Sequence, residues 1–156
     1  MIEIAIPGRD KYIIRNLILD LNGTIAVDGN IIGGVKEKLA MLSQKLDIFL
    51  VTADMNKNAE RLVKDLPVKL YKIKETEENN QKLRVVLKKG KNNTVSIGNG
   101  CNDVSMLKES AIGICMVGGE GASAEAMMAS DLVVVTINDA LDLLLKPHRL
   151  GATLRR

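Results

Sequence analysis

Short apolar runs alternate with segments of helical spacing along most of the chain. The runs predict strands over residues 2–6, 13–19, 48–52, 68–73, 94–97, 112–117 and 132–135. The segments between them predict helices over 35–46, 57–64, 81–89, 103–110, 122–129 and 138–145. Strands and helices in this order form right-handed βαβ units around a mostly parallel sheet. The pattern therefore predicts one α/β domain over residues 1–156, with Rossmann-like α/β/α layers.

Two turn sequences shape the N-terminal half of the chain. Pro7-Gly8 follows the first strand, which is expected to turn back and pair with the strand that begins near Tyr12. Further on, Asp28-Gly29 separates two short apolar runs within 25–32, a strong signal for a two-residue hairpin. This small hairpin comes shortly after Asp20, where it could cover a site as a flap.

Asp20 ends the β-branched, apolar run over residues 13–19. Asn22-Gly23 then supplies a turn, because both residues tolerate a positive φ angle. A carboxylate at the carboxyl end of a central strand lies where open α/β sheets bind their ligands. On this stretch alone, however, the preferred interpretation is that Asp20 simply begins a polar turn.

Composition and charge restrict the class of protein. With 46% apolar and 26% charged residues, the 156-residue chain is typical of a soluble globular domain. A net charge of +3, with one Phe, two Tyr and no Trp, argues against nucleic-acid binding. No apolar run approaches the roughly 20 residues that cross a bilayer, and the N-terminus lacks the layout of a signal peptide. We therefore expect a cytoplasmic protein with no membrane partner.

The cysteines and the histidine exclude several kinds of catalytic site. Cys101 and Cys115 lack metal-ligand spacing and form no disulfide framework, so both are expected to be reduced thiols. His148 is the only histidine in the chain, which argues against a His-dependent triad or a His-rich zinc site. The chemistry must therefore come from other side chains.

Polar side chains stand at the ends of several predicted strands. Asp20 and Thr52 follow two of them, and Asn99 and Asp103 follow the strand over 94–97, while Lys82 opens the helix before it. If the sheet is doubly wound, all these residues share one edge of it. A carboxylate nucleophile, a hydroxyl, an ammonium group and oxygen ligands for Mg²⁺ are the groups that phosphoryl transfer requires.

These residues resemble the four motifs of the haloacid dehalogenase superfamily and, within it, of the phosphorylation domain of P-type ATPases. The motifs are matched, in order, by Asp20-Leu21-Asn22-Gly23-Thr24, Val51-Thr52-Ala53-Asp54, Lys82, and Gly98-Asn99-Gly100-Cys101-Asn102-Asp103. Downstream positions also resemble the ATPase pattern, among them Gly113, Gly121, Glu125 and Asp131. The chain looks like the small soluble, capless proteins described as P-type-ATPase-like.

The resemblance implies a role for each matched residue. The catalytic residues would be the nucleophile Asp20, which forms an aspartyl-phosphate, with Asn22, Thr52 and Lys82. The phosphorylated substrate would contact Gly23, Thr52, Ala53, Lys82 and Asn102. The cofactor would be Mg²⁺, surrounded by Asp20, the carbonyl of Asn22, Asn99 and Asp103.

Two departures from the family pattern affect the expected chemistry. Asn22 stands at the acid/base position, and an amide cannot carry out proton transfer, which is worth about 10²–10⁴ in rate. Asn99 removes one anionic oxygen from the expected magnesium site, so affinity for the cation should fall. P-type ATPases also lack an acid at the position of Asn22. Transfer from an anhydride or acyl phosphate therefore stays plausible, whereas hydrolysis of a monoester is handicapped.

Asp20 and Thr52 are only 32 residues apart, which leaves room for the hairpin and one helix but for no cap domain. We expect a homo-oligomer whose second subunit covers the site, or a bulky substrate such as a phosphoprotein in place of a phosphorylated small molecule. The basic tail over 146–156 is expected to pack on a neighbouring subunit or to fray. The leading hypothesis is a magnesium-dependent phosphohydrolase. The alternative is a phosphate-sensing or protein-binding module that has lost turnover.

Overall fold

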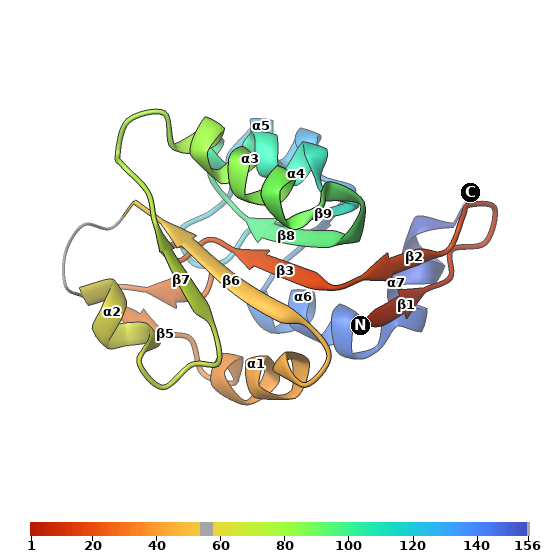
Figure 1. The fold of residues 1–156 in the computed structure, drawn as a ribbon, viewed down its shortest axis with the longest axis horizontal. Helices are drawn as coiled ribbons and strands as arrows, with labels where there is room; N and C mark the ends of the chain where they lie inside the picture. The colour runs from red at the N-terminus through yellow and green to blue at the C-terminus, as the bar shows by residue number, and fades with distance from the viewer. Residues whose placement is uncertain (54–57, 156) are drawn as a thin grey trace.

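The computed structural model describes residues 1–53 and 58–155 of the chain, and a parallel six-stranded sheet forms its middle layer (Figure 1). The strand order is β10-β9-β8-β3-β6-β7, and every neighbouring pair is parallel. The strands are β3 (Asn16–Leu19), β6 (Asp47–Thr52), β7 (Lys69–Lys72), β8 (Thr94–Gly98), β9 (Ile112–Met116) and β10 (Leu132–Val134). The predicted α/β class and the parallel sheet are confirmed.

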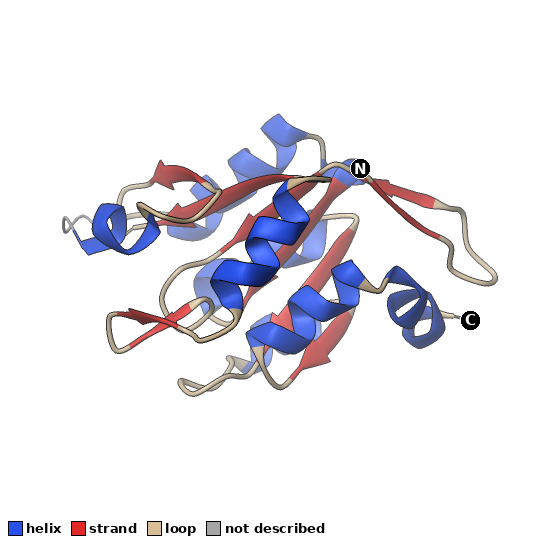
Figure 2. Ribbon diagram, turned by 90° about the horizontal axis from the view of Figure 1, so that it is seen from below, coloured by secondary structure: helices blue, strands red, loops and turns tan. Residues whose placement is uncertain are grey.

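Helices cover both faces of this sheet. On one face lie α3 (Glu78–Lys89), α4 (Val104–Glu109) and α5 (Ala124–Ala129), with the short 3₁₀ turns Lys91–Asn93 and Cys101–Asp103. On the other lie α1 (Val35–Ser43), α2 (Asn58–Val63) and α6 (Ile137–Leu145), and the view from below shows α1 and α6 in front of the sheet (Figure 2). The three predicted layers are therefore present.

The central strand β3 is buried on both faces because helices cover both sides of the sheet. Leu17 and Leu19 pack in the apolar cluster beneath α1 and α6, whereas Ile18 packs with Val86 and Met106 under α3 and α4. This alternation explains why the sequence shows a continuous apolar run here instead of a polar–apolar repeat. It also fixes Asp20 at the end of a strand that is held rigidly in the core.

The predicted strand over 13–19 is divided in two at Arg15. β2 (Tyr12–Ile14) pairs antiparallel with β1 (Ile2–Ile4) as a separate two-stranded sheet, while β3 enters the central sheet. The main chain of Arg15 makes the change of partner, because its N–H donates to the Asn93 carbonyl and its carbonyl accepts from Asp47 N. The predicted pairing of the first two strands is confirmed.

The small hairpin after Asp20 is present as β4 (Ala26–Val27) and β5 (Asn30–Ile31). Both residues of its turn have positive φ angles, 51° at Asp28 and 72° at Gly29, as a two-residue hairpin turn requires. Between β3 and β6 the chain holds only this hairpin and α1, as expected for a site without a cap. Several helix starts differ from prediction by one to three residues. For example, α3 begins at Glu78 instead of 81 and α5 at Ala124 instead of 122, while α6 begins at Ile137 and is capped by Thr136.

The basic tail forms a helix, α7 (Pro147–Leu154), so the expectation that it frays is wrong, whereas packing on a neighbouring subunit stays a prediction. Pro147 stands in the first turn, where its missing N–H leaves no helical bond unmade. Leu150 and Leu154 are buried in the main apolar cluster, and α7 lies along β1 (Figure 1). The two ends of the described chain therefore pack against each other.

The contact between α7 and the segment after β1 predicts an unusual effect of a glycine substitution. A Cβ at Gly151 would overlap the carbonyl oxygen of Ala5. We expect Gly151→Ala to lower the free energy of unfolding by about 1–3 kcal/mol in chemical denaturation, as overpacking does. At an unobstructed helical position the same change would stabilise by about 1 kcal/mol. A stabilised Gly151→Ala would contradict the packing, and Ala152→Ser on the exposed side of α7 is the control.

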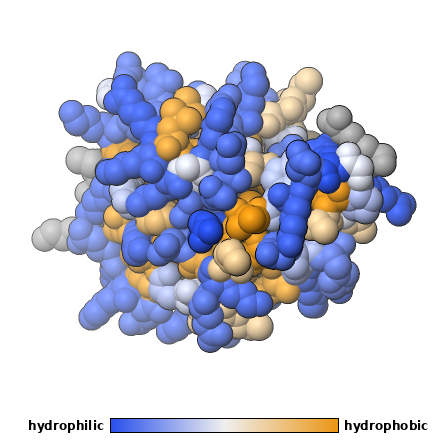
Figure 3. Space-filling model, turned by 45° about the vertical axis from the view of Figure 1, so that its right-hand side comes forward, coloured by the Kyte–Doolittle hydropathy of each residue, from blue (hydrophilic) through white to orange (hydrophobic). Residues whose placement is uncertain are grey.

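Hydrophilic side chains cover most of the face seen in Figure 3, with small apolar patches between them. Among residues 1–53 and 58–155, no helix combines the length and the apolar character needed to span a membrane.

Candidate active site

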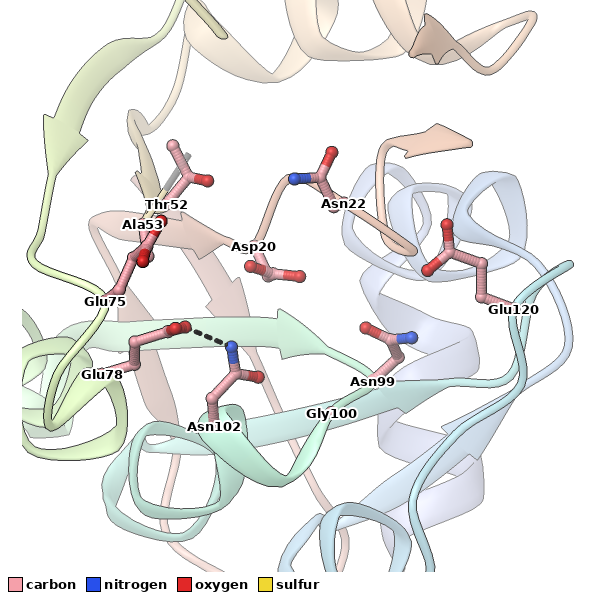
Figure 4. Close-up of a pocket in the computed structure, with 10 residues that line it drawn as sticks. All are labelled: Asp20, Asn22, Thr52, Ala53, Glu75, Glu78, Asn99, Gly100, Asn102 and Glu120. Atoms are coloured by element: carbon pink, nitrogen blue, oxygen red, sulfur yellow. Dashed lines mark hydrogen bonds between the residues drawn. The ribbon is translucent and has the colours of Figure 1, made fainter. Parts of the chain in front are cut away.

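Three strand ends bring the predicted site residues to one edge of the sheet. β3 lies between β6 and β8, so Asp20, Thr52 and Asn99 follow or end three adjacent parallel strands. They line a cavity of about 780 Å³ (Figure 4). Its lining residues are Asp20, Asn22, Thr52, Ala53, Glu75, Glu78, Asn99, Gly100, Asn102 and Glu120. The predicted gathering of these strand ends is confirmed.

Lys82 lies beneath the cavity between two carboxylates. Its Nζ donates to Asp20 Oδ1 at 2.8 Å and to Asp103 Oδ1 at 2.7 Å. Lys82 and Asp103 are completely buried, and Asp20 is 6% exposed. Helix α3 therefore delivers the predicted ammonium group to the predicted nucleophile, where it faces the end of β3 from below the cavity.

The three charges alter each other's titration. Burial and the nearby Asp103 raise the pKa of Asp20 to about 7, although Lys82 acts against this increase. Burial would lower the pKa of Lys82, but its two carboxylate partners outweigh burial and raise that pKa above its ordinary value. Two acids share one base, so a negative charge is held at the end of β3 without full compensation.

Asp103 is directed away from the cavity, toward Lys82 and the main chain. While its Oδ1 accepts from Lys82, its Oδ2 accepts from the N–H groups of Asn99 and Gly100, both at 3.0 Å. Gly98 makes room for this carboxylate, since a Cβ there would lie 2.5 Å from Asp103 Cγ. Asp103 is not among the described residues that line the cavity. The structure thus places it as the support of Lys82 and of the turn after β8.

Thr24 connects the two predicted metal-site side chains that do face the cavity. Its buried hydroxyl lies 3.3 Å from Asp20 Oδ2 and 3.4 Å from Asn99 Oδ1. Both oxygens therefore lie close to a single point. Together with the carbonyl of Asn22, they are oxygen donors of the kind that Mg²⁺ prefers, so the residues fit this cation. Among the described residues, however, no three His, Cys, Asp or Glu side chains are grouped to hold a metal.

The remaining predicted residues lie around the cavity or behind it. Asn22, Ala53 and Asn102 line it, and Asn102 Nδ2 donates to Glu78 Oε2 at 2.6 Å (Figure 4). Gly23 lies behind the lining, where its φ angle of +78° and its lack of a Cβ allow neighbouring side chains to approach. The predicted substrate-binding set is therefore close together, but its contacts with substrate stay a prediction.

Sequence reasoning gave no role to three acids of the cavity, Glu75, Glu78 and Glu120. Glu75 and Glu78 belong to the charged stretch before and at the start of α3, where a solvated surface is the ordinary expectation. Glu120 lies in the loop after β9, between Gly118-Gly119 and Gly121. An acid among glycines at the carboxyl end of a further parallel strand is the signal that could have identified it.

Comparison with known proteins agrees with this geometry. Residues 78–140 match the family model described as haloacid dehalogenase-like hydrolase. The fold is similar to the cobalt-bound deoxy-D-mannose-octulosonate 8-phosphate phosphatase of Haemophilus influenzae, with a TM-score of 0.72 and 15% identity over 89% of this chain and 91% of that one. Residues 78–140 thus resemble the haloacid dehalogenase superfamily in sequence, and the whole chain shares the fold of phosphatases such as this one.

Other known proteins are similar to this chain in fold or in sequence. The 3-deoxy-D-manno-octulosonate 8-phosphate phosphatase of Moraxella catarrhalis, solved with magnesium, phosphate and the sugar acid, gives a TM-score of 0.67 at 16% identity, covering 89% of this chain and 90% of that one. An uncharacterized protein of Methanocaldococcus jannaschii is 54% identical over 61 residues, or 39% of this chain and 66% of its own. A second one from that organism is 53% identical over 38 residues, or 24% of this chain and 86% of its own.

The match over residues 78–140 and the shared fold support the predicted superfamily. The closer likeness to the phosphorylation domain of P-type ATPases stays a prediction, as does the role of each site residue.

Proposed function

We propose that this protein is a member of the haloacid dehalogenase superfamily, and that it is a Mg²⁺-dependent phosphohydrolase or phosphotransferase that acts through an aspartyl-phosphate on Asp20. One observation carries the proposal. Asp20 stands at the base of an open cavity with one carboxylate oxygen on the Lys82 ammonium at 2.8 Å and the other beside the Thr24 hydroxyl at 3.3 Å. A carboxylate in such a setting is an oriented nucleophile with a cation beside it.

In the proposed reaction, an Asp20 oxygen attacks the phosphorus atom, and the bond to the leaving group breaks with its electron pair on the leaving oxygen. Lys82 reduces the repulsion between the Asp20 carboxylate and the phosphoryl oxygens. The Thr52 hydroxyl, at the end of the neighbouring strand β6, binds a phosphoryl oxygen. Water then attacks the aspartyl-phosphate, which releases inorganic phosphate and restores the Asp20 carboxylate.

Mg²⁺ would be held by Asp20, the Asn22 carbonyl and Asn99, and when bound it supplies positive charge that screens the repulsion between the phosphate and the acids of the cavity. That screening is needed, because four acids line the cavity, Asp20, Glu75, Glu78 and Glu120, and no Lys or Arg is found among its described lining residues.

The leaving group must depart without a proton from position 22. The side chain of Asn22 faces the cavity but has no proton to transfer (Figure 4). Substrates whose leaving group is stable as an anion, such as acyl phosphates and anhydrides, are therefore favoured over ordinary monoesters. The cavity is wide and open, and it admits a bulky substrate such as a phosphoprotein. A second subunit over the cavity stays part of the proposal.

An amide-to-acid substitution tests this function. We expect the wild-type protein with Mg²⁺ to hydrolyse acetyl phosphate and p-nitrophenyl phosphate, whose leaving groups are stable as anions, but to act poorly on alkyl monoesters. In Asn22→Asp, hydrolysis of the alkyl monoesters should rise by about 10²–10⁴, because the restored acid protonates the leaving oxygen. Release of inorganic phosphate is the measurement, and Asp28→Asn, on the hairpin turn, is the control for a charge change nearby.

The proposal would be refuted if neither protein released phosphate from any of these compounds in a Mg²⁺-dependent manner. Loss of acetyl phosphate hydrolysis on adding a chelator is the second expected result, because the acids of the cavity would then repel the substrate.

The amides Asn22 and Asn99 favour a second candidate, a phosphate-sensing or protein-binding module that has lost turnover. The Asn22 side chain lines the cavity but cannot take a proton from the water that would hydrolyse an aspartyl-phosphate. Such a module would become phosphorylated once by acetyl phosphate and would retain the phosphate. Multiple turnovers faster than about one per second, a rate usual for enzymes, would exclude it.

A further inference from the structure

Asn99 leaves the proposed cation site with too little negative charge. Asp103, the other acid of that motif, is occupied by Lys82 Nζ and by the N–H groups of Asn99 and Gly100. Asp20 would then be the only carboxylate on the cation, and it already shares Lys82. The inference that follows rests on the proposed function and concerns where the second carboxylate comes from.

Glu120, in the loop after β9, brings a carboxylate close to the proposed cation site. A Cβ at Gly23 would lie 2.6 Å from Glu120 Oε2 and 2.7 Å from Asn99 Nδ2, so both atoms approach one point above the turn after β3. Figure 4 shows the Glu120 carboxylate turned toward the side of the cavity that holds Asn22 and Asn99. Gly23 permits this approach only because it has no side chain.

The amide of Asn99 holds the Glu120 loop in position. The side-chain Nδ2 donates to the Gly121 carbonyl at 3.0 Å, and the main-chain carbonyl of Asn99 accepts from Ser123 N at 2.8 Å. An aspartate at this position could not donate to Gly121, because a carboxylate carries no proton to give. Asn99 thus replaces the acid of the family motif and, through its amide, also holds the loop that carries Glu120 at the cavity.

Among the described residues, the Glu120 side chain has no interaction that would hold it in another role. No hydrogen bond or ion pair to its carboxylate is found there, in contrast to Glu78, which accepts from Asn102. Glu120 is also exposed to solvent, so that its carboxylate is free to turn toward a cation. Its position on the loop after β9 places it beside Asn99 at the sheet edge.

We propose that Glu120 is the second carboxylate of the divalent-cation site, in place of the acid absent at Asn99, and that it acts directly or through a water bound to the cation. Asn99 is then a positioning residue for the loop as well as a neutral oxygen donor. The site keeps two carboxylates, Asp20 and Glu120, with the charge moved from the loop after β8 to the loop after β9.

Binding of Mg²⁺ in the absence of any phosphate compound tests this proposal. We expect isothermal titration calorimetry to give a Mg²⁺ dissociation constant at least 10-fold higher for Glu120→Gln than for the wild type, the range found when a carboxylate near a metal is removed. The rise in melting temperature with Mg²⁺ should shrink in parallel. Glu75→Gln is the matched control, because Glu75 lies on the opposite side of Asp20 in the same cavity (Figure 4).

Three results would overturn the proposal: unchanged affinity in Glu120→Gln, an equal loss in Glu75→Gln, or no measurable Mg²⁺ binding by the wild type. Unchanged melting temperatures of the variants without Mg²⁺ show that each one is folded. The proposed function is judged separately, by phosphate release. If Mg²⁺ binding depends on Glu120 but no phosphate is released, the inference about Glu120 holds and the proposed function is refuted. If phosphate is released but Mg²⁺ binding does not depend on Glu120, the proposed function holds and the inference is refuted.

Discussion

Lys82→Met is expected to lower the free energy of unfolding by about 3–5 kcal/mol at pH 7.5, the cost of leaving buried charges without their partner. Lys82 is completely buried and is the cation that both Asp20 and Asp103 contact, at 2.8 and 2.7 Å. Methionine has a similar length but no charge, so packing is largely retained while two carboxylates are left facing each other. Urea denaturation followed by circular dichroism measures the difference.

Two further variants separate charge from packing in this prediction. Lys88→Met makes the same change at an exposed position on α3 and should alter stability by less than about 0.5 kcal/mol. Adding Asp20→Asn and Asp103→Asn to Lys82→Met should restore much of the loss, because no buried charge then lacks a partner. If Lys82→Met is as stable as the wild type, the ammonium group does not compensate these acids in solution.

Asp20→Asn is expected to abolish phosphate release and, at the same time, to stabilise the fold above pH 7 in the absence of divalent cations. In the unfolded chain Asp20 releases its proton near 3.8, but in the folded protein only at about 7. Between these values the folded state keeps a proton that the unfolded state has lost, so the free energy of unfolding falls as the pH rises. Asparagine resembles the protonated acid and carries no such cost.

The expected gain of Asp20→Asn over the wild type is therefore close to zero at pH 4, grows through pH 7 and is constant above pH 8, at about 2–4 kcal/mol. Denaturation curves of both proteins across this pH range, with a chelator present, give the difference directly. A gain that is the same at pH 4 and pH 8 would mean that ionisation of Asp20 is not its source. A destabilised variant at pH 8 would contradict the burial of an incompletely compensated charge.

Much of the fold could be predicted from the sequence because each βα unit has a local signature. The apolar run ending at Asp20 and the Asp28-Gly29 turn are specified by residues within a few positions of each other. The split at Arg15 is different. The apolar pattern continues across it, and only the partners β1 on one side and β6 and β8 on the other show where the strand changes sheets.

The site was predictable where residues follow strands and unpredictable where side chains meet across loops. Lys82 and Asp20 were placed together because a doubly wound sheet determines which strand ends are neighbours. The orientation of Asp103 depends on two main-chain N–H groups, which no residue pattern encodes. Similarly, the position of Glu120 depends on the missing Cβ of Gly23 and on the Asn99 amide, and the packing of α7 depends on the small size of Gly151.

The order of strands has a consequence for how such a protein can change over evolutionary time. β8 and β9 are adjacent and parallel, so the loops that follow them reach the same cavity from neighbouring positions. A charged group can move from one loop to the other by point substitutions, while the sheet and every helix stay as they are. The fold thus allows active-site residues to be exchanged one at a time, and every intermediate sequence can still fold.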